Sequence, residues 1–538
     1  MKNIYILIMA AQLLPAAIFA QNKNPQVKIT NGTLEGTETD GVRSFKGIPF
    51  AKAPVGDLRW KEPQPAENWS GLRKADHFGA NAMQKKIFGD MLFRSSGMSE
   101  DCLFLNVWTP AKSSVEKLPV LVYFFGGGFV AGDGSEGRYD GESMAKKGIV
   151  TLTVNYRLGV FGFMAHPELT KESPHHASGN YGLMDQTAAL KWVQQNIEAF
   201  GGDPKRVTIA GESAGSISVF AQMASPLSKN LIAGAIGESG AMISPTAAPI
   251  TLEQAENKGV AFAQKANAKS LADLRALNAN DLLDAASQPG AFSVSAVVDG
   301  YFFPELPVKI FEAGEQAHVP LLAGWNSTEV SYQALLGSDA PTPENYANKL
   351  KQLYGDKSEE AMKLYPGKTQ AEVIQSATAL ASARFIVYST WKWLDVHAKT
   401  SGQPTYSYVF SKAKPPMTAD FVNATPGLAG GITKNAEPPR VKPAAIAVGA
   451  PHAFEIEYAM GNLDKNKVYA WTPEDYKISA TMLQYFADFV KTGSPNGTSL
   501  PVWGQISKNN DQQMNIGLKT QQQKQNRARY LFLDQIYQ

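Results

Sequence analysis

The sequence predicts an α/β protein in which helices cover the faces of a large, mostly parallel sheet. From about residue 41 to residue 220, short runs of β-branched residues alternate with helical patterns. A strand that is followed by a helix and then by another strand favours parallel pairing. The chain has 538 residues, of which 44% are hydrophobic. It can therefore bury a large core, and its length is compatible with about three domains or with one large α/β unit. The motifs described below favour one domain over residues 21–538.

Three strands and one helix are predicted in the first half of the chain. The strands are "LPVLVYFF" (118–125), "GIVTLTVNYRL" (148–158) and "RVTIAGE" (206–212). Between the last two, "DQTAALKWVQQNIEAF" (185–200) has apolar residues at helical spacing. The "GGDP" that follows predicts the end of this helix.

The second half is expected to be more helical. Residues 251–288 and 343–399 are rich in Ala, Leu, Lys and Glu, which favours helices. Between them, "VPLLAGWNSTEVSY" predicts a short strand that runs into a polar turn. A last strand, "TYSYVF" (405–410), precedes a passage rich in Pro and Gly (411–451), where no regular element is expected.

The first twenty residues are typical of a secretory signal peptide. An apolar stretch follows the N-terminal lysine and ends at the small residue Ala20, before polar "QNKNP". We expect cleavage after Ala20 and a secreted or periplasmic mature protein. The alternative is a membrane anchor, for which the stretch is short and is interrupted by Gln12 and Pro15. No later segment is long and apolar enough to predict an integral membrane protein.

Charge and cysteine content exclude several classes of function. The 51 basic and 49 acidic residues give a net charge of +2, which offers no field for nucleic acid. Cys102 is the single cysteine, so no intramolecular disulfide can form, and its place before a strand-like run favours a buried packing thiol. No HExxH pattern or cysteine cluster is present, so we expect neither a metal nor another cofactor. The oligomeric state stays open.

A reactive serine is predicted in "VTIAGESAGSISVF" (207–220). A Gly-x-Ser-x-Gly pattern is weak alone, but here a strand precedes it and a plausible helix follows it. Such a turn exposes the serine side chain, and the flanking glycines let other backbone pass close by. We therefore predict Ser213 as a nucleophile; the alternative is an ordinary turn serine.

A serine nucleophile requires a base and an acid that orients the base. In hydrolases with a sheet of this type, the three residues follow one another along the chain in the order serine, acid, histidine. If the acid lies in or after "GWNSTEV", His397 and His452 are the candidates for the base. His397 lies in a helix-like stretch, whereas His452 lies in the irregular "AVGAPHAFEIEYAMG", where a loop can present it. Glu329 follows the strand in "VPLLAGW" at the edge where functional loops gather, although any single glutamate could instead form a structural salt bridge.

The triple glycine in "VLVYFFGGGFVAGDG" comes directly after a strand. Backbone amides there can stabilise the negative charge of a tetrahedral intermediate. The pattern lacks the Lys-Ser/Thr of a phosphate-binding loop. We expect the amides of Gly127, Gly128 and Ala214 to form an oxyanion hole.

Several blocks of the chain together resemble the type-B carboxylesterases, a cholinesterase-like family of the α/β-hydrolase fold. They include "FKGIPFAKAPVGDLRW", "SEDCLFLNVWTP", "NYRLGVFGF", "VTIAGESAGS", "GWNSTEV" and "PHAFEIEYAMG". The resemblance implies helical insertions that form a cap around an active-site gorge. It implies the same triad of Ser213, Glu329 and His452, and the same oxyanion hole. It also implies that Glu212 lies near His452 and that Ser239 is a hydrogen-bond partner behind the triad.

Three departures from the family pattern are evident. Phe125 precedes the triple glycine where relatives often have His or Tyr. Met83 stands where relatives have a cysteine that pairs with the one at position 102. The loop between them lacks the Trp that holds choline in cholinesterases, so we do not expect choline esters as substrates; Phe88 and Phe93 could line the gorge instead.

The passage 411–451 suggests a further hypothesis. It carries five cations, and it could cap the site and favour anionic esters; the alternative is a solvated loop. The cations are Lys412, Lys414, Lys434, Arg440 and Lys442.

The expected function is hydrolysis of a small-molecule carboxylic ester through an acyl-enzyme, with Ser213 as nucleophile and His452 as base. The alternatives are a lipase for longer acyl chains and a non-catalytic, cholinesterase-like binding protein. The natural ester is not determined by the sequence.

Overall fold

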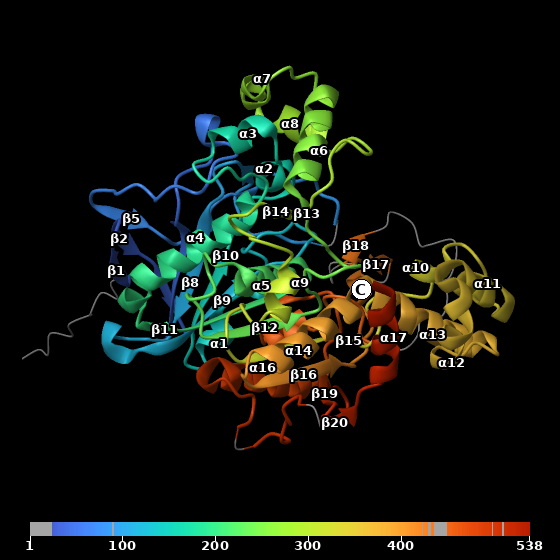
Figure 1. Cartoon of the computed structure of the whole chain (residues 1–538). Coiled ribbons are helices and arrows are strands. Elements are labelled where there is room, and N and C mark those ends of the chain that lie inside the picture. Colours follow the sequence, from blue (N-terminus) through green and yellow to red (C-terminus); the bar gives the residue numbers. More distant parts are fainter. Residues whose placement is uncertain are drawn as a thin grey trace, which may run out of the picture.

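A sheet of 11 strands forms the centre of the molecule (Figure 1). The computed structural model describes residues 24–88, 91–421, 423–428, 432–434, 449–497, 499–507 and 510–537. The predicted signal peptide, residues 1–20, lies outside these ranges. The strands of this one sheet come from both ends of the described chain, since its outermost members begin at Thr37 and end at Lys524. A single domain over residues 21–538 stays a prediction.

The strand order of the sheet is β20-β19-β16-β15-β12-β11-β9-β10-β8-β4-β3. Its members are β3 (Thr37–Thr39), β4 (Val42–Pro49), β8 (Phe104–Thr109), β9 (Leu118–Phe124), β10 (Val150–Val154), β11 (Gly202–Glu212), β12 (Gly234–Glu238), β15 (Leu321–Asn326), β16 (Thr405–Phe410), β19 (Gln512–Ile516) and β20 (Gln521–Lys524). From β10 to β19 all neighbours pair in parallel, whereas β20 and the strands from β8 to β3 pair antiparallel. The predicted mostly parallel sheet is therefore confirmed.

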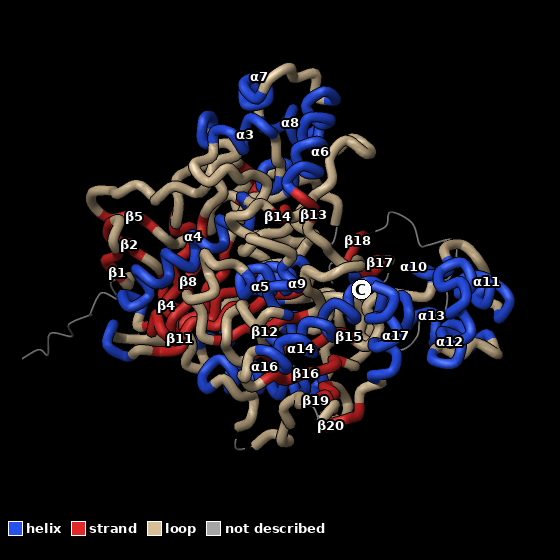
Figure 2. Tube along the Cα trace, viewed as in Figure 1, coloured by secondary structure: helices blue, strands red, loops and turns tan. Residues whose placement is uncertain are grey.

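Burial on both faces explains the composition of the central strands. All residues of β10, β12, β15 and β16 are buried. Strands of this kind read as continuous apolar runs because helices cover the sheet on each side. The longer helices that contact the sheet include α4 (Tyr181–Asn196), α5 (Ala214–Ala224), α14 (Tyr388–Thr400) and α16 (Pro473–Thr492). Figure 2 shows them packed along the strands.

Two groups of helices project from this core (Figure 1). One consists of α6 (Leu252–Lys265), α7 (Leu271–Ala276) and α8 (Ala279–Ala286). The other consists of α10 (Gln333–Leu336), α11 (Pro343–Tyr354), α12 (Ser358–Leu364) and α13 (Gln370–Ser382). The first group falls in the region 251–288, where the composition predicted helices. In the second group, α11 to α13 fall in the predicted region 343–399, and α10 lies directly before it.

Some element boundaries differ from the sequence prediction. The helix expected over 185–200 begins at Tyr181, and its last turn, Ile197–Phe200, is a 3-10 helix. Gly201 ends it with φ of 80°, but the rest of "GGDP" already belongs to β11. The prediction of no regular element over 411–451 is wrong in part, because β17 (Ala424–Pro426) and β18 (Ile432–Lys434) pair there.

Two further features concern the single cysteine and the lengths of the helices. Cys102 is buried and unbonded to another cysteine, as expected for a packing thiol. Within the described ranges, none of the helices combines the length and the apolar character that a membrane crossing needs.

Candidate active site

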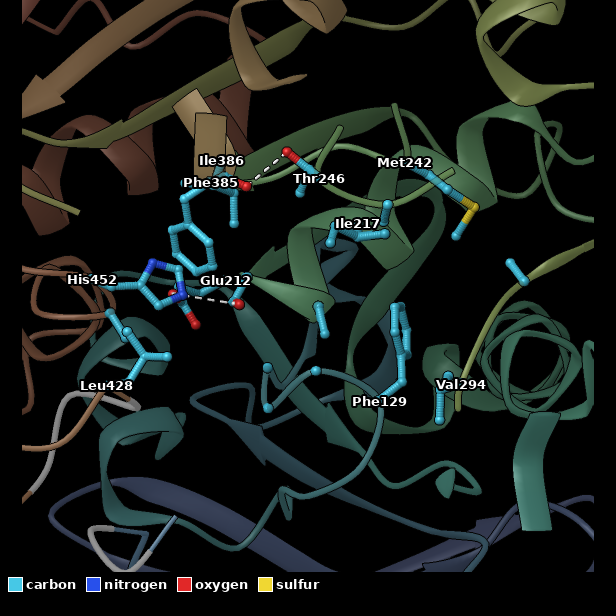
Figure 3. A pocket seen from close by; sticks show the side chains of 18 of the residues that line it. Phe129, Glu212, Ile217, Met242, Thr246, Val294, Phe385, Ile386, Leu428 and His452 are labelled. Carbon is cyan, nitrogen blue, oxygen red and sulfur yellow. Dashed lines mark hydrogen bonds and ion pairs between the residues drawn. The ribbon is translucent and has the colours of Figure 1, made fainter. Parts of the chain in front are cut away.

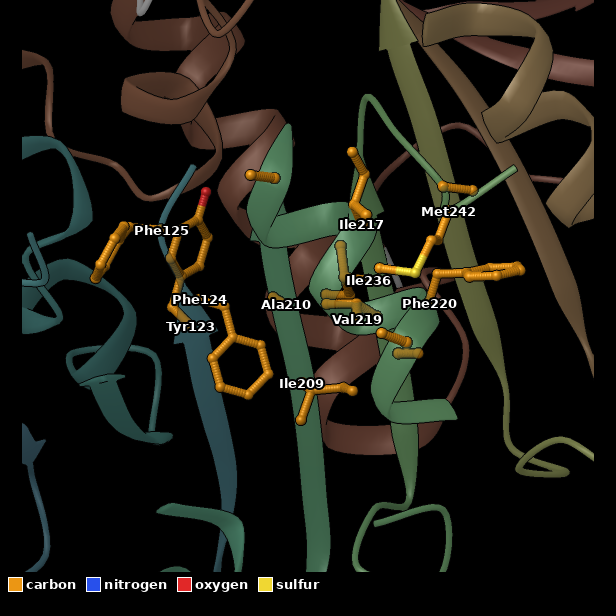
Figure 4. Close-up of a cluster of buried hydrophobic side chains, with 14 of the residues drawn as sticks. Tyr123, Phe124, Phe125, Ile209, Ala210, Ile217, Val219, Phe220, Ile236 and Met242 are labelled. Carbon is orange, nitrogen blue, oxygen red and sulfur yellow. The ribbon is translucent and has the colours of Figure 1, made fainter. Parts of the chain in front are cut away.

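The turn at Ser213 is formed between β11 and α5 at the carboxyl edge of the sheet. Ser213 has φ of 56° and ψ of −120°, a conformation that costs about 1–3 kcal/mol for a residue other than glycine. Its amide donates to the Glu238 carbonyl at 2.8 Å, and its carbonyl accepts from the Ile217 amide at 2.9 Å. These bonds and the apolar packing beneath the turn (Figure 4) hold the strained backbone in place.

The two glycines around Ser213 are required by close backbone contacts. A Cβ at Gly215 would lie 2.0 Å from the Phe124 carbonyl oxygen, and one at Gly211 would lie 2.6 Å from the same atom. The strand β9 therefore passes too close for any side chain at either position. This is the physical reason for the Gly-x-Ser-x-Gly spacing.

The structure brings Ser213, His452 and Glu329 together from three distant parts of the chain. His452 Nε2 lies 3.0 Å from Ser213 Oγ, and His452 Nδ1 lies 2.6 Å from Glu329 Oε2. The backbone of the two loops is also joined, because the His452 amide donates to the Glu329 carbonyl at 3.1 Å. Both His452 and Glu329 are buried, and Phe385 packs edge-on against the imidazole with ring centroids 5.0 Å apart.

Glu212 and Ser239 both lie beside this group of three residues. Glu212 Oε1 is 3.2 Å from His452 Nε2. The Ser239 hydroxyl donates to Glu329 Oε1 at 2.6 Å, and the same oxygen accepts from the Asn326 amide at 2.6 Å. With Oε1 held by these two donors, Oε2 faces the imidazole.

Two further buried carboxyls, Glu238 and Glu455, were not singled out from the sequence. Burial raises the pKa of Glu238 from 4.5 to about 8 and the pKa of Glu455 well above 4.5, with nearby carboxyls adding to the latter rise. Burial likewise raises the pKa of Glu212, against the opposing effect of Arg138. The sequence indicates that Glu238 and Glu455 belong to the site only by their positions. Glu238 directly precedes Ser239, and Glu455 is three residues after His452.

The triple-glycine loop lies directly against the serine turn. A Cβ at Gly126 would be 3.1 Å from Ser213 Cβ and 2.6 Å from the Glu212 carbonyl oxygen. Gly127 and Gly128 have φ of 116° and 63°, which glycine adopts at no steric cost. The Gly127 carbonyl accepts from two amides of the same turn, and the amides of Gly127, Gly128 and Ala214 belong to residues that line one pocket with Ser213 and His452.

Tyr156 and Gln84 brace this loop, and sequence reasoning missed both. The Tyr156 hydroxyl donates to the Phe125 carbonyl at 2.6 Å, and its ring stacks on Phe125 with centroids 4.4 Å apart. The Gln84 side chain exchanges two hydrogen bonds of 2.9 Å with the backbone of Gly132. Phe125 has no polar group with which to hold the loop, and the buried Tyr156 hydroxyl supports it from the neighbouring strand end.

The pocket that contains Ser213 has a volume of about 470 Å³. Figure 3 shows His452, Phe385 and Leu428 on one side of it and Phe129, Met242 and Val294 on the other. Most of these side chains are apolar, as in sites that bind small organic molecules. Leu428 comes from the passage 411–451, so a described part of that passage contributes to the pocket wall.

Other residues named from the sequence lie elsewhere. His397 is buried in α14, where burial lowers its pKa to about 4 and its Nε2 lies 3.0 Å from the Val319 carbonyl oxygen. Lys412 pairs with Asp475 at 2.8 Å, and Lys414 lies 2.9 Å from the Tyr469 hydroxyl; neither lines the pocket. Arg440 and Lys442 lie outside the described parts of the chain, and so does the side chain of Lys434.

The described residues include no group of three or more His, Cys, Asp or Glu side chains arranged to hold a metal. Ser213 and His452 do present a hydroxyl and an imidazole to the pocket, and the Glu329 carboxyl completes the hydrogen-bonded series behind the imidazole. These groups follow β11, β16 and β15 at one edge of the parallel strands, behind a glycine loop that follows β9. This arrangement on this sheet defines the α/β-hydrolase fold.

The chain belongs to the carboxylesterase family, whose model matches residues 23–533. Among curated relatives, the fumonisin B1 esterase of Sphingopyxis macrogoltabida is 33% identical over 93% of this chain and 88% of its own. The para-nitrobenzyl esterase of Bacillus subtilis (strain 168) is 34% identical over 86% of this chain and 89% of its own. The protein is thus a carboxylic ester hydrolase, as the sequence resemblance predicted.

Solved structures agree with this assignment. The crystal structure of a Geobacillus stearothermophilus carboxylesterase at pH 6.2 has a TM-score of 0.78 and 30% sequence identity to this protein. The match covers 95% of this chain and all of that one. The α/β-hydrolase fold inferred from the resemblance is therefore confirmed.

Proposed function

We propose that this protein is an exported serine esterase that hydrolyses small carboxylic esters through an acyl-enzyme on Ser213. One observation carries the proposal: the unbroken series from Ser213 Oγ to His452 Nε2 at 3.0 Å and from His452 Nδ1 to Glu329 Oε2 at 2.6 Å. A serine hydroxyl is a poor nucleophile alone, and a base at hydrogen-bonding distance is what activates it.

In the first half-reaction, His452 Nε2 accepts the Ser213 proton as Oγ attacks the ester carbonyl carbon. Glu329 keeps the Nδ1–H tautomer and stabilises the imidazolium. The carbonyl oxygen gains negative charge and accepts hydrogen bonds from the amides of Gly127, Gly128 and Ala214. The tetrahedral intermediate then collapses: the bond to the alcohol oxygen breaks, and His452 returns the proton to it.

The second half-reaction repeats these steps with water. His452 takes a proton from water as the water oxygen attacks the acyl carbon. Collapse of the second tetrahedral intermediate breaks the bond to Ser213 Oγ, which takes the proton back from His452. The carboxylic acid leaves, and the resting enzyme is regenerated.

The first test is hydrolysis of p-nitrophenyl esters from acetate to decanoate by the mature protein and its Ser213→Ala variant. We expect the variant to lose activity by at least about 10³-fold on every ester, because the nucleophile is absent. A fluorophosphonate should label the wild type once, on the peptide that contains Ser213, and should not label the variant. Full activity of Ser213→Ala would reject the proposed nucleophile.

The same series separates the alternatives. An optimum at decanoate with a rise in rate above the solubility limit of the ester would identify a lipase. A folded wild type with no activity on any ester, and with no fluorophosphonate label, would indicate a binding role.

Export is supported by the apolar N-terminal stretch that ends at Ala20. The intact mass of protein recovered from the periplasm or medium tests it. We expect a mature chain that begins at Gln21. A full-length chain that stays with the membrane fraction would indicate an anchor instead.

A further inference from the structure

A second hollow lies next to the pocket of Ser213. Its volume is about 410 Å³. The apolar part of its lining comes from Phe88, from residues 91–98 and from the loop after the triple glycine. These residues are Phe88, Met91, Leu92, Phe93, Met98 and Ala131.

The two hollows share a wall. Phe88 and Met91 line both of them. Met91 is buried, packs with Ala131, and is so close to the glycine loop that a Cβ at Gly127 would lie 3.0 Å from Met91 Cε. Phe88 and Met91 therefore form the boundary that the two hollows share.

The far side of the second hollow exposes apolar surface to water. Leu92 is 67% exposed and Met98 is 47% exposed, while Phe93 is half-buried. Exposed apolar side chains that gather around a hollow are typical of a binding surface. Of Phe88 and Phe93, the two candidates from the sequence to line the gorge, only Phe88 lines the pocket of Ser213, and Phe93 lines the second hollow.

Most of the polar side chains that line the hollow already have partners within the protein. Among them, Asn81 and Gln84 form hydrogen bonds within the protein, and Lys85 forms an ion pair with Asp284. Lys86 is exposed to solvent. Apart from the Lys86 ammonium, the surface left for a ligand in the hollow is therefore the apolar wall.

We propose that the second hollow is a subsite for the distal apolar chain of the ester, which reaches it past Phe88 and Met91 while the reacting carbonyl lies at Ser213. This inference rests on the proposed esterase function. It predicts that esters long enough to pass the shared wall gain affinity for the transition state. Each methylene that leaves water should raise kcat/KM by about four-fold.

The test compares short and long esters with a charge placed on the outer wall. Leu92→Asp puts a carboxylate beside the chain and, because Leu92 is exposed, should leave the fold intact. Leu518→Asp is the matched control, since Leu518 is also 67% exposed and does not line the hollow. Two substrate series are used: p-nitrophenyl esters of growing acyl chain, and acetates of growing alkyl alcohols.

We expect Leu92→Asp to lower kcat/KM about ten-fold for the ten-carbon member of one series, a loss equal to the gain from one to two methylenes. Acetate hydrolysis should stay within about two-fold of wild type, and Leu518→Asp should change neither. The series that responds identifies whether the acyl or the alcohol chain occupies the subsite. Met98→Asp, on another part of the same wall, should repeat the result.

Three outcomes would overturn the proposal. Unchanged long-chain kcat/KM in both Asp variants would show that the chain does not enter the hollow. An equal loss on acetate and on long esters would place the effect at the reacting centre instead. A wild type that is inactive on all esters would reject the esterase function, and the subsite with it, whereas an active wild type with unaltered variants rejects the subsite alone.

Discussion

At the scale of single residues, Tyr156 holds the triple-glycine loop in place without lining the pocket of Ser213. Its hydroxyl donates to the Phe125 carbonyl, and Phe125 is the residue directly before the triple-glycine loop. A buried carbonyl that loses its donor costs about 1–3 kcal/mol. Part of that cost should appear as a shift of the loop away from the geometry that the proposed oxyanion hole requires.

We therefore predict that Tyr156→Phe lowers kcat about ten-fold with little change in KM, because the loss falls on the transition state. The inhibition constant of an alkyl trifluoromethyl ketone should weaken in parallel with kcat/KM. Tyr365→Phe is the control: among the described residues its buried hydroxyl has no hydrogen-bond partner. Equal effects of the two substitutions would refute the bracing role of Tyr156.

Glu238 leads to a prediction about pH. Its pKa is raised by burial from 4.5 to about 8, so the folded protein holds a proton that the unfolded chain releases above pH 4.5. The resulting stabilisation is complete below pH 4.5 and is lost as the pH rises towards 8. Glu238→Gln keeps a neutral side chain at every pH. The difference in Tm, variant minus wild type, should therefore become more positive between pH 5 and pH 9.

Thermal unfolding followed by circular dichroism at the two pH values measures this difference. Glu315→Gln, at an exposed position, should give the same difference in Tm at both. A Glu238→Gln difference that stays constant or falls with pH would contradict the assignment.

At the scale of elements, the unit formed by β9, β11 and α5 carries the site. The two strands are adjacent in the sheet, and the helix turns back over them at Ser213. The close passage of β9 is possible because positions 211 and 215 are glycines. Strand pairing and helix packing therefore both depend on the absence of two side chains.

Gly215→Ala should destabilise the protein by at least about 3 kcal/mol, because its Cβ would meet backbone of β9 that cannot move without breaking the sheet. Soluble yield and Tm measure the effect. Gly137→Ala is the matched control, since a Cβ there makes only ordinary contacts at 3.7 Å and beyond. A Gly215→Ala protein with wild-type Tm would show that β9 and α5 can separate at little cost.

At the scale of the whole molecule, the stability has no contribution from an intramolecular disulfide. The single cysteine allows no intramolecular disulfide, and Cys102 is buried beside the sheet, where burial raises the pKa of its thiol well above the usual range. A thiol of this kind is a poor nucleophile towards reagents in solution.

We predict that Ellman's reagent labels no thiol in the native protein and one per chain in guanidinium chloride. Dithiothreitol should leave Tm unchanged. Rapid labelling of the folded protein, or a lower Tm under reducing conditions, would show that Cys102 is accessible or takes part in a cross-link between chains.

The sequence by itself determined the features that depend on neighbouring residues. Alternation of apolar strands and helices predicted the parallel sheet, and the strand, glycines and helix around Ser213 predicted its turn. Chain order and local composition were enough to choose His452 over His397 and to favour Glu329. These features can be predicted from the sequence because backbone preferences and hydrophobic periodicity act over a few neighbouring residues.

Only the tertiary structure decided which distant residues meet. Glu238, Glu455 and Tyr156 are ordinary residues in their own segments, and their proximity to the site arises from the order in which the strands pair. The short edge strands, the pairing of β17 with β18 and the second hollow behind Phe88 depend on packing between segments far apart in the chain. Such contacts are set by the shape and burial of the assembled core, which local sequence patterns do not encode.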